Sequence, residues 1–390
     1  MEKSSTLNEF KNLDIIVFGE DFSSHPHSLE HLMRPLFDDN RVIWVETIGL
    51  RSPKINLYDL KKVFRKILVW CRLNRSLLHK KLPPETVSVV TPFMVPYNQF
   101  SFIRKLNTYL VTKCVRQKIK GLNFKPLLTI TSVINSCDYI GLFNEKKIIF
   151  VCVDEFSLWP GLDSKMVSGM EKKLIDKSDL IFATSSELVK NKKSNSCETI
   201  LLTHGVDYSH FKLPAKVIHK DKVNICYFGL FDERTDQSII KHIVDNLENI
   251  VIHIIGKVAC DNSILKNHSR IQFYDSVSYD VLPAKIENMD IFILPYFMNE
   301  LTKNINPLKL KEYLSTGRPV ISTPLPEVLQ LKKYLYIAKT KSEFLTVIES
   351  ILNNLPIQNI ESAADYIQKS ETWKAKANFF SNTIVSKLSI

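Results

Sequence analysis

Residues Asn304–Thr323, reading N-I-N-P-L-K-L-K-E-Y-L-S-T-G-R-P-V-I-S-T, decide the fold of this chain. Pro307 suits the first turn of a helix, where its missing N–H would have no partner in any case. Apolar side chains then recur on roughly one face, at Leu308, Leu310 and Leu314. Gly317 supplies a left-handed C-cap, and Val320–Thr323 is typical of a short strand. The stretch therefore predicts a capped helix that leads into a parallel strand.

Polar residues at the start of this helix favour a ligand site. The N-terminus of a helix attracts anions, and here it follows Asn306 and carries Lys309, with Glu312 one turn further on. An anionic group could lie beside the lysine while hydroxyl groups donate to the glutamate. The alternative is that Lys309 and Glu312 form only the solvated face of an amphipathic helix.

The pattern P-x-K-x-x-E-Y-L-x-x-G-x-P-V, which spans Pro307–Val320, resembles the donor-binding segment of GT-B glycosyltransferases that build bacterial surface polysaccharides. The resemblance implies that Glu312 binds the ribose hydroxyls of a nucleotide-sugar. Many members carry another glutamate eight residues upstream, where this chain has Asn304. Asn304 is thus a candidate for contact with the transferred sugar.

Short runs rich in β-branched residues alternate with amphipathic segments along the whole chain, which predicts parallel sheets covered on both faces. The first series of predicted strands is 14–18, 41–46, 87–91, 127–131, 148–153, 180–184 and 199–202. The second series is 223–228, 250–255, 270–274, 291–294, 319–323 and 335–338. The fold class is therefore α/β, with two Rossmann-like domains.

We place an acceptor-binding domain at residues 1–210, a polar linker at 211–222 and a nucleotide-sugar-binding domain at 223–362. A helical segment completes the chain at 363–390. The resemblance implies that the two domains face a cleft and that this last segment packs back on the first domain.

Three of the ten glycines, Gly19, Gly229 and Gly256, directly follow predicted strands. Open α/β sheets bind ligands at the carboxyl ends of their strands, so these glycines favour ligand loops, although a simple turn explains each one equally well. The loop after Gly19 also holds Asp21, His25 and His27, and Ser28 is a candidate N-cap of the next helix. The resemblance points these polar residues toward the acceptor. A metal site is less supported, because no further cysteine or histidine cluster completes it.

Asp154 and Glu155 follow the predicted strand 148–153 as the two candidate catalytic carboxylates. Successive side chains at a strand end point to opposite faces, so at most one of them faces a ligand, and we favour Asp154. Such a carboxylate could accept a proton from an attacking hydroxyl or stabilise positive charge on the sugar. Capping of the following segment is the alternative role.

In the second domain, Arg234 is the candidate partner of the donor diphosphate, because a guanidinium can bind two oxygens at once. An ion pair with Asp232 or Asp236 is the alternative. Tyr296, at the end of the predicted strand 291–294, is a candidate for shaping the nucleotide pocket. The chain has no D-x-D motif, and a helix dipole with lysine and arginine can neutralise a diphosphate, so we expect no metal and no cofactor other than the nucleotide-sugar co-substrate.

The chain carries a net charge of 52 − 41 = +11, which favours anionic partners. Basic residues concentrate at 54–81, where apolar residues recur at spacings of three and four, so we predict a basic amphipathic helix on an anionic membrane surface. A surface helix packed on its own domain is the alternative. Nucleic acid is disfavoured, because no aromatic residues are interleaved on the charged face.

No apolar run approaches the roughly 18 residues of a membrane span, and residues 1–5 lack the plan of a signal peptide. The seven cysteines are scattered without a C-x-x-C pair, which is typical of reduced core residues. We therefore expect a cytoplasmic protein that lies peripherally on the inner membrane face.

Together these patterns predict a metal-independent glycosyltransferase that moves a sugar from a UDP- or GDP-linked donor to a lipid-linked or growing surface glycan. A nucleotide-sugar epimerase on the same fold is one alternative, and it would turn over without an acceptor. A non-catalytic basic protein of the membrane surface is the other, and nucleotide binding would count against it.

Overall fold

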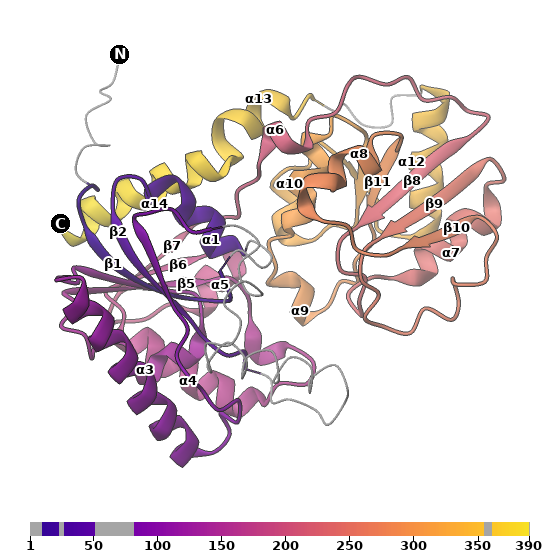
Figure 1. Cartoon of the computed structure of the whole chain (residues 1–390). Coiled ribbons are helices and arrows are strands. Elements are labelled where there is room, and N and C mark those ends of the chain that lie inside the picture. The colour runs from indigo at the N-terminus through magenta and orange to yellow at the C-terminus, as the bar shows by residue number, and fades with distance from the viewer. Residues whose placement is uncertain (1–9, 23–26, 51–81, 355–360, 390) are drawn as a thin grey trace. The chain divides into compact units, whose positions relative to one another are not determined.

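A computed structural model describes residues 10–22, 27–50, 82–354 and 361–389 of the 390-residue chain. It divides into two compact units, one formed by Met1–Thr203 with Lys376–Ile390 and one formed by His204–Ala375 (Figure 1). The predicted basic helix at 54–81 lies outside the described residues. Within those residues, no helix combines the length and the apolar character that crossing a membrane requires.

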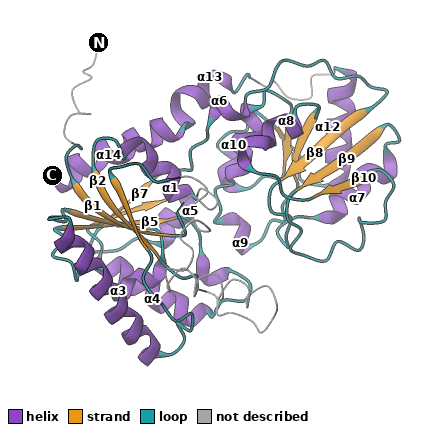
Figure 2. Cartoon of the chain, viewed as in Figure 1, coloured by secondary structure: helices purple, strands orange, loops and turns teal. Residues whose placement is uncertain are grey.

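Every predicted strand is present, with ends within one residue of those expected, and all strand pairs are parallel (Figure 2). The first sheet has the order β3-β2-β1-β4-β5-β6-β7. Its strands are β1 (Asp14–Gly19), β2 (Arg41–Glu46), β3 (Val87–Val90), β4 (Leu128–Thr131), β5 (Lys147–Cys152), β6 (Leu180–Ala183) and β7 (Glu198–Leu201).

Helices cover both faces of this sheet, with α3 and α4 below it and α1 and α14 above it in Figure 1. The helices of this part are α1 (Ser28–Met33), α3 (Ser101–Gly121), α4 (Ser164–Lys177), α5 (Ser186–Asn191) and α14 (Trp373–Leu388). Short 3₁₀ turns lie at Arg34–Leu36, Ile134–Asp138 and Phe156–Leu158. Most side chains of the inner strands are therefore buried, which explains why these strands are mainly apolar, whereas the edge strand β7 is partly exposed.

The second sheet has the order β10-β9-β8-β11-β12-β13, the arrangement of a doubly wound dinucleotide-type fold. Its strands are β8 (Val223–Phe228), β9 (Ile250–Ile255), β10 (Ile271–Tyr274), β11 (Ile291–Leu294), β12 (Val320–Ser322) and β13 (Tyr336–Ile337). Its helices are α6 (Tyr208–Phe211), α7 (Gln237–Asn246), α8 (Leu282–Ile286), α9 (Glu300–Lys303), α10 (Leu308–Ser315), α11 (Pro326–Leu329), α12 (Lys341–Asn353) and α13 (Ala364–Tyr366). A 3₁₀ turn at Tyr279–Val281 and a π-helical turn at Ile367–Glu371 complete it.

The stretch 304–323 folds as its residues predict, except that the helix begins one residue after Pro307. Gly317 has a φ of +71°, as expected of a left-handed C-cap, and β12 then pairs in parallel with β11. Tyr313 is fully buried on the inner face of α10. Its hydroxyl accepts from the N–H of Phe228 and donates to the carbonyl oxygen of the same residue, both at 3.0 Å. The helix is thereby fastened to the carboxyl end of β8.

The C-terminal segment divides between the two units. Residues 376–389 pack on the first sheet, where the rings of Phe380 and Phe182 lie 4.7 Å apart and Lys387 pairs with Glu198 at 2.8 Å. This confirms the predicted return of the last helix. Residues 361–375 belong instead to the second unit, to which Ile367 contributes a fully buried side chain.

The junction between the units lies before the predicted linker 211–222. Residues 204–210, which the sequence placed in the first domain, belong to the second unit, because Val206 and Tyr208 are buried in its apolar core together with Phe211. The N-cap of α1 also differs from the expectation. His27 occupies it with an extended backbone and no capping hydrogen bond, and Ser28 is the first helical residue.

Candidate functional site

Two glycines at strand ends bring three loops of the second unit together. Gly229 follows β8 with a φ of +107°, and Gly256 follows β9 with a φ of +140°. A Cβ on Gly256 would lie 2.2 Å from the carbonyl oxygen of Gly229, and a Cβ on Gly229 would lie 2.3 Å from Cε of Lys309. Only glycine lets the two loops and the lysine approach so closely.

Replacing Gly229 by alanine should lower the free energy of unfolding, by about 1 to 3 kcal/mol from backbone strain alone, with a further loss from the collision with Lys309. Gly161→Ala is the matched control, because Gly161 also has a positive φ of +80° but open space around it. Denaturant unfolding of Gly229→Ala, Lys309→Ala and the double variant separates the two effects. The loss of unfolding free energy in the double variant should differ from the sum of the losses in the two single variants. If it equals that sum, the two residues do not contact each other.

Lys309 lies at the centre of this loop cluster, on the first turn of α10. Its Nζ donates to the hydroxyl oxygens of Tyr227 at 2.6 Å and Tyr296 at 3.2 Å, and to the carbonyl oxygen of Leu230 at 2.8 Å. Burial lowers the pKa of Lys309, although Tyr296 opposes this change. The ammonium group thus fixes the loop after β8 in place.

Arg234 also contacts Tyr296, with its guanidinium carbon 5.6 Å from the ring centroid. Its side chain pairs with Asp232, with Nε 3.0 Å from both carboxylate oxygens and Nη2 2.7 Å from Oδ2. The ion pair considered as the alternative role of Arg234 is therefore present. The two cations lower the pKa of Tyr296, even though burial of the phenol acts in the opposite direction.

Glu312 lies one turn after Lys309 and is half-buried. Among the described residues its carboxylate has neither a hydrogen bond nor an ion pair. Burial raises the pKa of Glu312 to about 7, and the nearby charge of Lys309 offsets only part of this rise. A half-buried carboxylate without a partner is costly to a fold and typical of a ligand site.

Asn304 and Asn306 have structural partners. Asn304 is the C-cap residue of α9, and its Nδ2 donates to the carbonyl oxygen of Glu300 at 2.7 Å. Asn306 links two segments, because its Oδ1 accepts from the N–H of His204 and its Nδ2 donates to Glu327, both at 3.3 Å. The loop cluster itself thus joins Gly229, Gly256, Arg234, Tyr296 and Lys309, with Glu312 on the same helix as the lysine.

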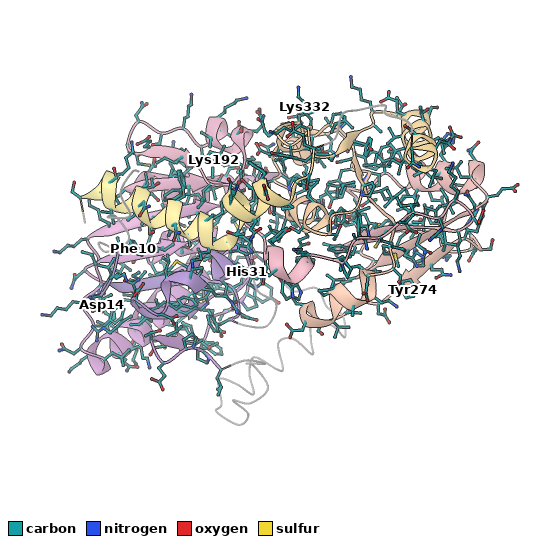
Figure 3. The ribbon with its side chains drawn as sticks, turned by 90° about the horizontal axis from the view of Figure 1, so that it is seen from above. Phe10, Asp14, His31, Lys192, Tyr274 and Lys332 are labelled. Atoms are coloured by element: carbon teal, nitrogen blue, oxygen red, sulfur yellow. The ribbon has the colours of Figure 1, made fainter. Side chains whose placement is uncertain are left out.

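In the first unit, Glu155 points into the protein and is 8% exposed. Lys192 donates to Glu155 at 2.5 Å and to Glu171 at 2.7 Å, and the hydroxyl of Ser157 donates to Glu155 at 2.6 Å (Lys192 is labelled in Figure 3). Burial raises the pKa of Glu171, while Lys192 opposes that rise. Asp154, by contrast, is half-buried at the carboxyl end of β5.

The loop after β1 is only partly described, since His25 lies outside the described residues. Gly19 lies against the ring of Trp44, and a Cβ there would be 2.5 Å from the nearest ring carbon. His27 Nδ1 lies 3.2 Å from a carboxylate oxygen of Glu20, and Asp21 is half-buried beside them in sequence. In the described part of the chain, no group of three or more histidine, cysteine, aspartate or glutamate side chains is arranged to hold a metal.

Sequence reasoning missed Tyr227, Lys192 and Glu171. Tyr227 occupies an apolar position of a buried strand, and its hydroxyl reaches the carbonyl oxygen of Leu230 only because the chain turns back at Gly229. Lys192 stands in the run Lys190-Asn191-Lys192-Lys193, where nothing in the sequence distinguishes the one lysine that becomes buried.

Residues 223–354 match the family model described as glycosyl transferases group 1. Over 261 residues the chain is 23% identical to TuaH of Bacillus subtilis, a protein assigned as a teichuronic acid biosynthesis glycosyltransferase. The alignment covers 60% of this chain and 65% of TuaH, which is just under two thirds of that relative.

Solved structures share the fold across almost the whole chain. The structure of HepE from Anabaena, in complex with UDP and glucose, matches with a TM-score of 0.64 at 11% identity and covers 96% of this chain and 100% of that one. The catalytic domain of starch synthase IV from Arabidopsis thaliana, bound to ADP and acarbose, matches with a TM-score of 0.62 at 10% identity, covering 97% and 100%.

Proposed function

We propose that this chain is a group 1 glycosyltransferase of the GT-B fold, which transfers a sugar from a nucleotide-sugar to a surface-glycan acceptor. The donor would bind to the loop cluster of the second unit and the acceptor to the first unit. The observation that carries the proposal is Glu312, a carboxylate without a partner in the described residues and with a pKa of about 7. A ribose hydroxyl would supply the missing hydrogen bond.

The diphosphate would lie at the N-terminus of α10, an eight-residue helix, with Lys309 beside it. The N–H groups of Arg234 that do not bind Asp232 would donate to phosphate oxygens, while Asp232 holds the side chain in place. Because these groups can neutralise the diphosphate, we infer transfer without a metal and with no cofactor besides the donor. UDP-linked and GDP-linked sugars are the proposed donors.

The acceptor is proposed to be a lipid-linked or growing surface glycan at the cytoplasmic face of the membrane. The similarity to TuaH supports a surface polysaccharide as its class. Gly19, Asp21, His25 and His27 are the proposed acceptor contacts, and residues 54–81 are the proposed contact with anionic lipid. Turnover of the donor without any acceptor would instead favour an epimerase.

Replacing Glu312 by glutamine tests the donor site because two effects of opposite sign are expected. Nucleotide affinity should fall by about 1 to 3 kcal/mol, as when a charged hydrogen bond is lost. At pH 8 the free energy of unfolding should instead rise by about 1 to 3 kcal/mol, because the unpaired carboxylate is removed. Calorimetry with UDP, GDP and CMP and their sugar conjugates, together with thermal unfolding, measures both.

The pH dependence follows from the direction of the shift. The pKa of Glu312 in the folded protein, about 7, is above the ordinary value of 4.5, so this group's contribution to stability is fully present below pH 4.5 and is lost as the pH rises through 7. Nucleotide affinity should change in the opposite sense, falling as the pH drops through 7. Neither trend should occur in Glu312→Gln.

Glu300→Gln is the matched control, since Glu300 is exposed and pairs only at the surface with Lys303. It should leave nucleotide affinity and stability unchanged. If a folded Glu312→Gln variant binds nucleotides as tightly as the wild type, Glu312 is not part of the donor site.

A further inference from the structure

The segment Thr86–Cys137 contains no aspartate and no glutamate. It contains seven basic residues: Arg104, Lys105, Lys113, Arg116, Lys118, Lys120 and Lys125. Most of this segment is the 21-residue helix α3 with the loop that precedes it. Besides residues 54–81, the chain thus has a second segment in which positive charge is concentrated, and this segment includes a described helix.

The same segment exposes large apolar side chains. Seven of the eighteen such side chains that are exposed in the described residues lie between Phe93 and Leu122. Phe102 is 67% exposed and Tyr109 is 61% exposed, and the ring of Phe100 lies 5.8 Å from that of Phe102. Single exposed apolar residues need no explanation, but a cluster of aromatic residues in one short segment marks an interaction surface.

The exposed residues of α3 recur at spacings of three, four and seven, which places them on one side of the helix. We call this surface the α3 face. It consists of Phe102, Lys105, Leu106, Tyr109, Lys113 and Lys120. Its apolar residues occupy the N-terminal half and its lysines mainly the C-terminal half, over a length of about 27 Å.

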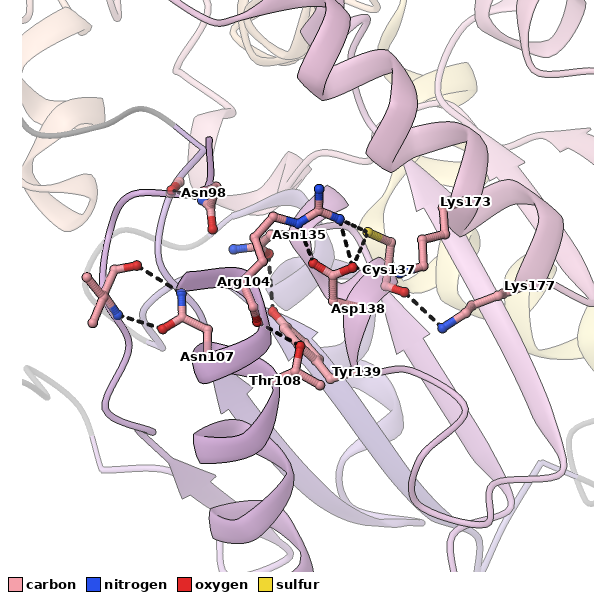
Figure 4. Close-up of polar contacts among 12 residues, drawn as sticks. Asn98, Arg104, Asn107, Thr108, Asn135, Cys137, Asp138, Tyr139, Lys173 and Lys177 are labelled. Carbon is pink, nitrogen blue, oxygen red and sulfur yellow. Dashed lines mark hydrogen bonds and ion pairs between the residues drawn. The ribbon is translucent and has the colours of Figure 1, made fainter. Parts of the chain in front are cut away.

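The opposite side of α3 is anchored in the first unit. Val111 and Val115 are fully buried, and Asn107 exchanges hydrogen bonds of 2.8 and 2.9 Å with the backbone of Val95 (Figure 4). Arg104 donates to both carboxylate oxygens of Asp138, at 2.7 and 2.8 Å. These contacts fix the rotation of the helix about its axis, so the α3 face points outward because of the packing of its own domain.

We propose that the α3 face docks on an anionic lipid surface. Aromatic side chains favour the interface between lipid and water, and lysines beside them are attracted to acidic headgroups. The absence of any acidic residue in the segment matches such a partner. Phe102, Leu106 and Tyr109 would enter the interface, while Lys105, Lys113 and Lys120 would contact headgroups. The α3 face would be a membrane contact in addition to the one proposed for residues 54–81, and lipid binding can be measured without donor or acceptor.

The test is cosedimentation of the full chain with vesicles of phosphatidylglycerol and phosphatidylcholine in equal parts, and with vesicles of phosphatidylcholine alone. The wild type should bind the anionic vesicles and bind them less at high salt. Replacing Lys105, Lys113 and Lys120 by glutamine should weaken this binding about tenfold or more. Phe102→Ser with Tyr109→Ser should weaken it by a similar factor, because the aromatic anchors are lost.

Two control variants remove the same kinds of side chain, three lysines or one exposed ring, from surfaces other than the α3 face. Lys165, Lys172 and Lys332 are exposed, and changing them to glutamine removes three charges from other surfaces. Phe379 is 47% exposed on α14, and Phe379→Ser removes an exposed ring. Both controls should bind anionic vesicles within twofold of the wild type. Circular dichroism and thermal unfolding should show that all variants remain folded.

Three results would overturn the proposal. The first is that both α3 variants bind anionic vesicles within twofold of the wild type, or that the wild type binds neutral vesicles as tightly as anionic ones. The second is loss of binding only when Lys61, Lys62, Arg65 and Lys66 are changed to glutamine, which would place the contact at 54–81. The third is a dimer in sedimentation velocity without lipid that Phe102→Ser with Tyr109→Ser dissociates, which would make the α3 face an interface between two copies.

Discussion

Replacement of Asp154 by asparagine is expected to lower kcat by about 10² to 10⁴-fold while the KM for the nucleotide-sugar stays unchanged. Asp154 follows β5, an interior strand, at the edge of the sheet where parallel α/β folds bind ligands. We propose that its carboxylate accepts the proton of the attacking hydroxyl or stabilises the positive charge of the sugar. Asparagine keeps the shape of the side chain but can do neither.

Steady-state kinetics with a saturating acceptor measure this effect. Asp163→Asn is the matched control, because Asp163 caps α4 through a hydrogen bond from the N–H of Met166, and asparagine is an equally good N-cap. That variant should keep wild-type kcat. If Asp154→Asn also retains kcat, the catalytic carboxylate lies elsewhere in the chain.

Replacement of Lys192 by methionine is expected to lower the free energy of unfolding by about 3 to 5 kcal/mol at pH 8. Lys192, Glu155 and Glu171 are between 5 and 8% exposed, and the ammonium group pairs with both carboxylates. Methionine fills a similar volume but leaves two buried carboxylates without a cation. Denaturant unfolding followed at pH 8 and at pH 5 measures the loss.

The loss should be smaller at pH 5. Burial already raises the pKa of Glu171 in the wild type, and without the lysine the main effect that opposes this rise is lost. The contribution of Glu171 to stability is then present at low pH and is lost as the pH rises through its raised pKa. Lys190→Met is the control, because Lys190 is 64% exposed and pairs with Glu187 at the surface, so its removal should cost at most about 0.5 kcal/mol. Equal losses in both variants would contradict the buried arrangement.

The two predictions concern neighbouring residues with different roles. Glu155 is held in the interior by Lys192, whereas Asp154 is half-buried after the carboxyl end of β5. Lys192→Met should act mainly on stability, whereas Asp154→Asn should act mainly on kcat.

Much of the fold follows from local patterns. The run Val223–Phe228 is apolar except at Asn224 and becomes a strand in the middle of a covered sheet, as the burial of parallel strands requires. Gly317 ends α10 because a left-handed residue is needed there, and Val320 then begins β12. These features depend on the backbone preferences of a few adjacent residues, so the sequence alone predicts them.

The boundary between the units was not predictable in the same way. The predicted linker 211–222 is polar and charged, yet its first residue, Phe211, packs against Phe228, with ring centroids 6.0 Å apart. His27, and not Ser28, occupies the N-cap position of α1. The packing of Phe211 is set by a contact with a residue distant in sequence.

Local sequence patterns are enough to predict the α/β class, the two sheets, the ends of their strands and the segment that holds Lys309 and Glu312. They do not reveal that Glu155 binds Lys192, that Arg234 binds Asp232 or that Glu312 has no partner among the described residues. Strands and helix caps arise from interactions within a few residues, whereas the partner of a charged side chain depends on which distant segment the fold brings within about 4 Å of it.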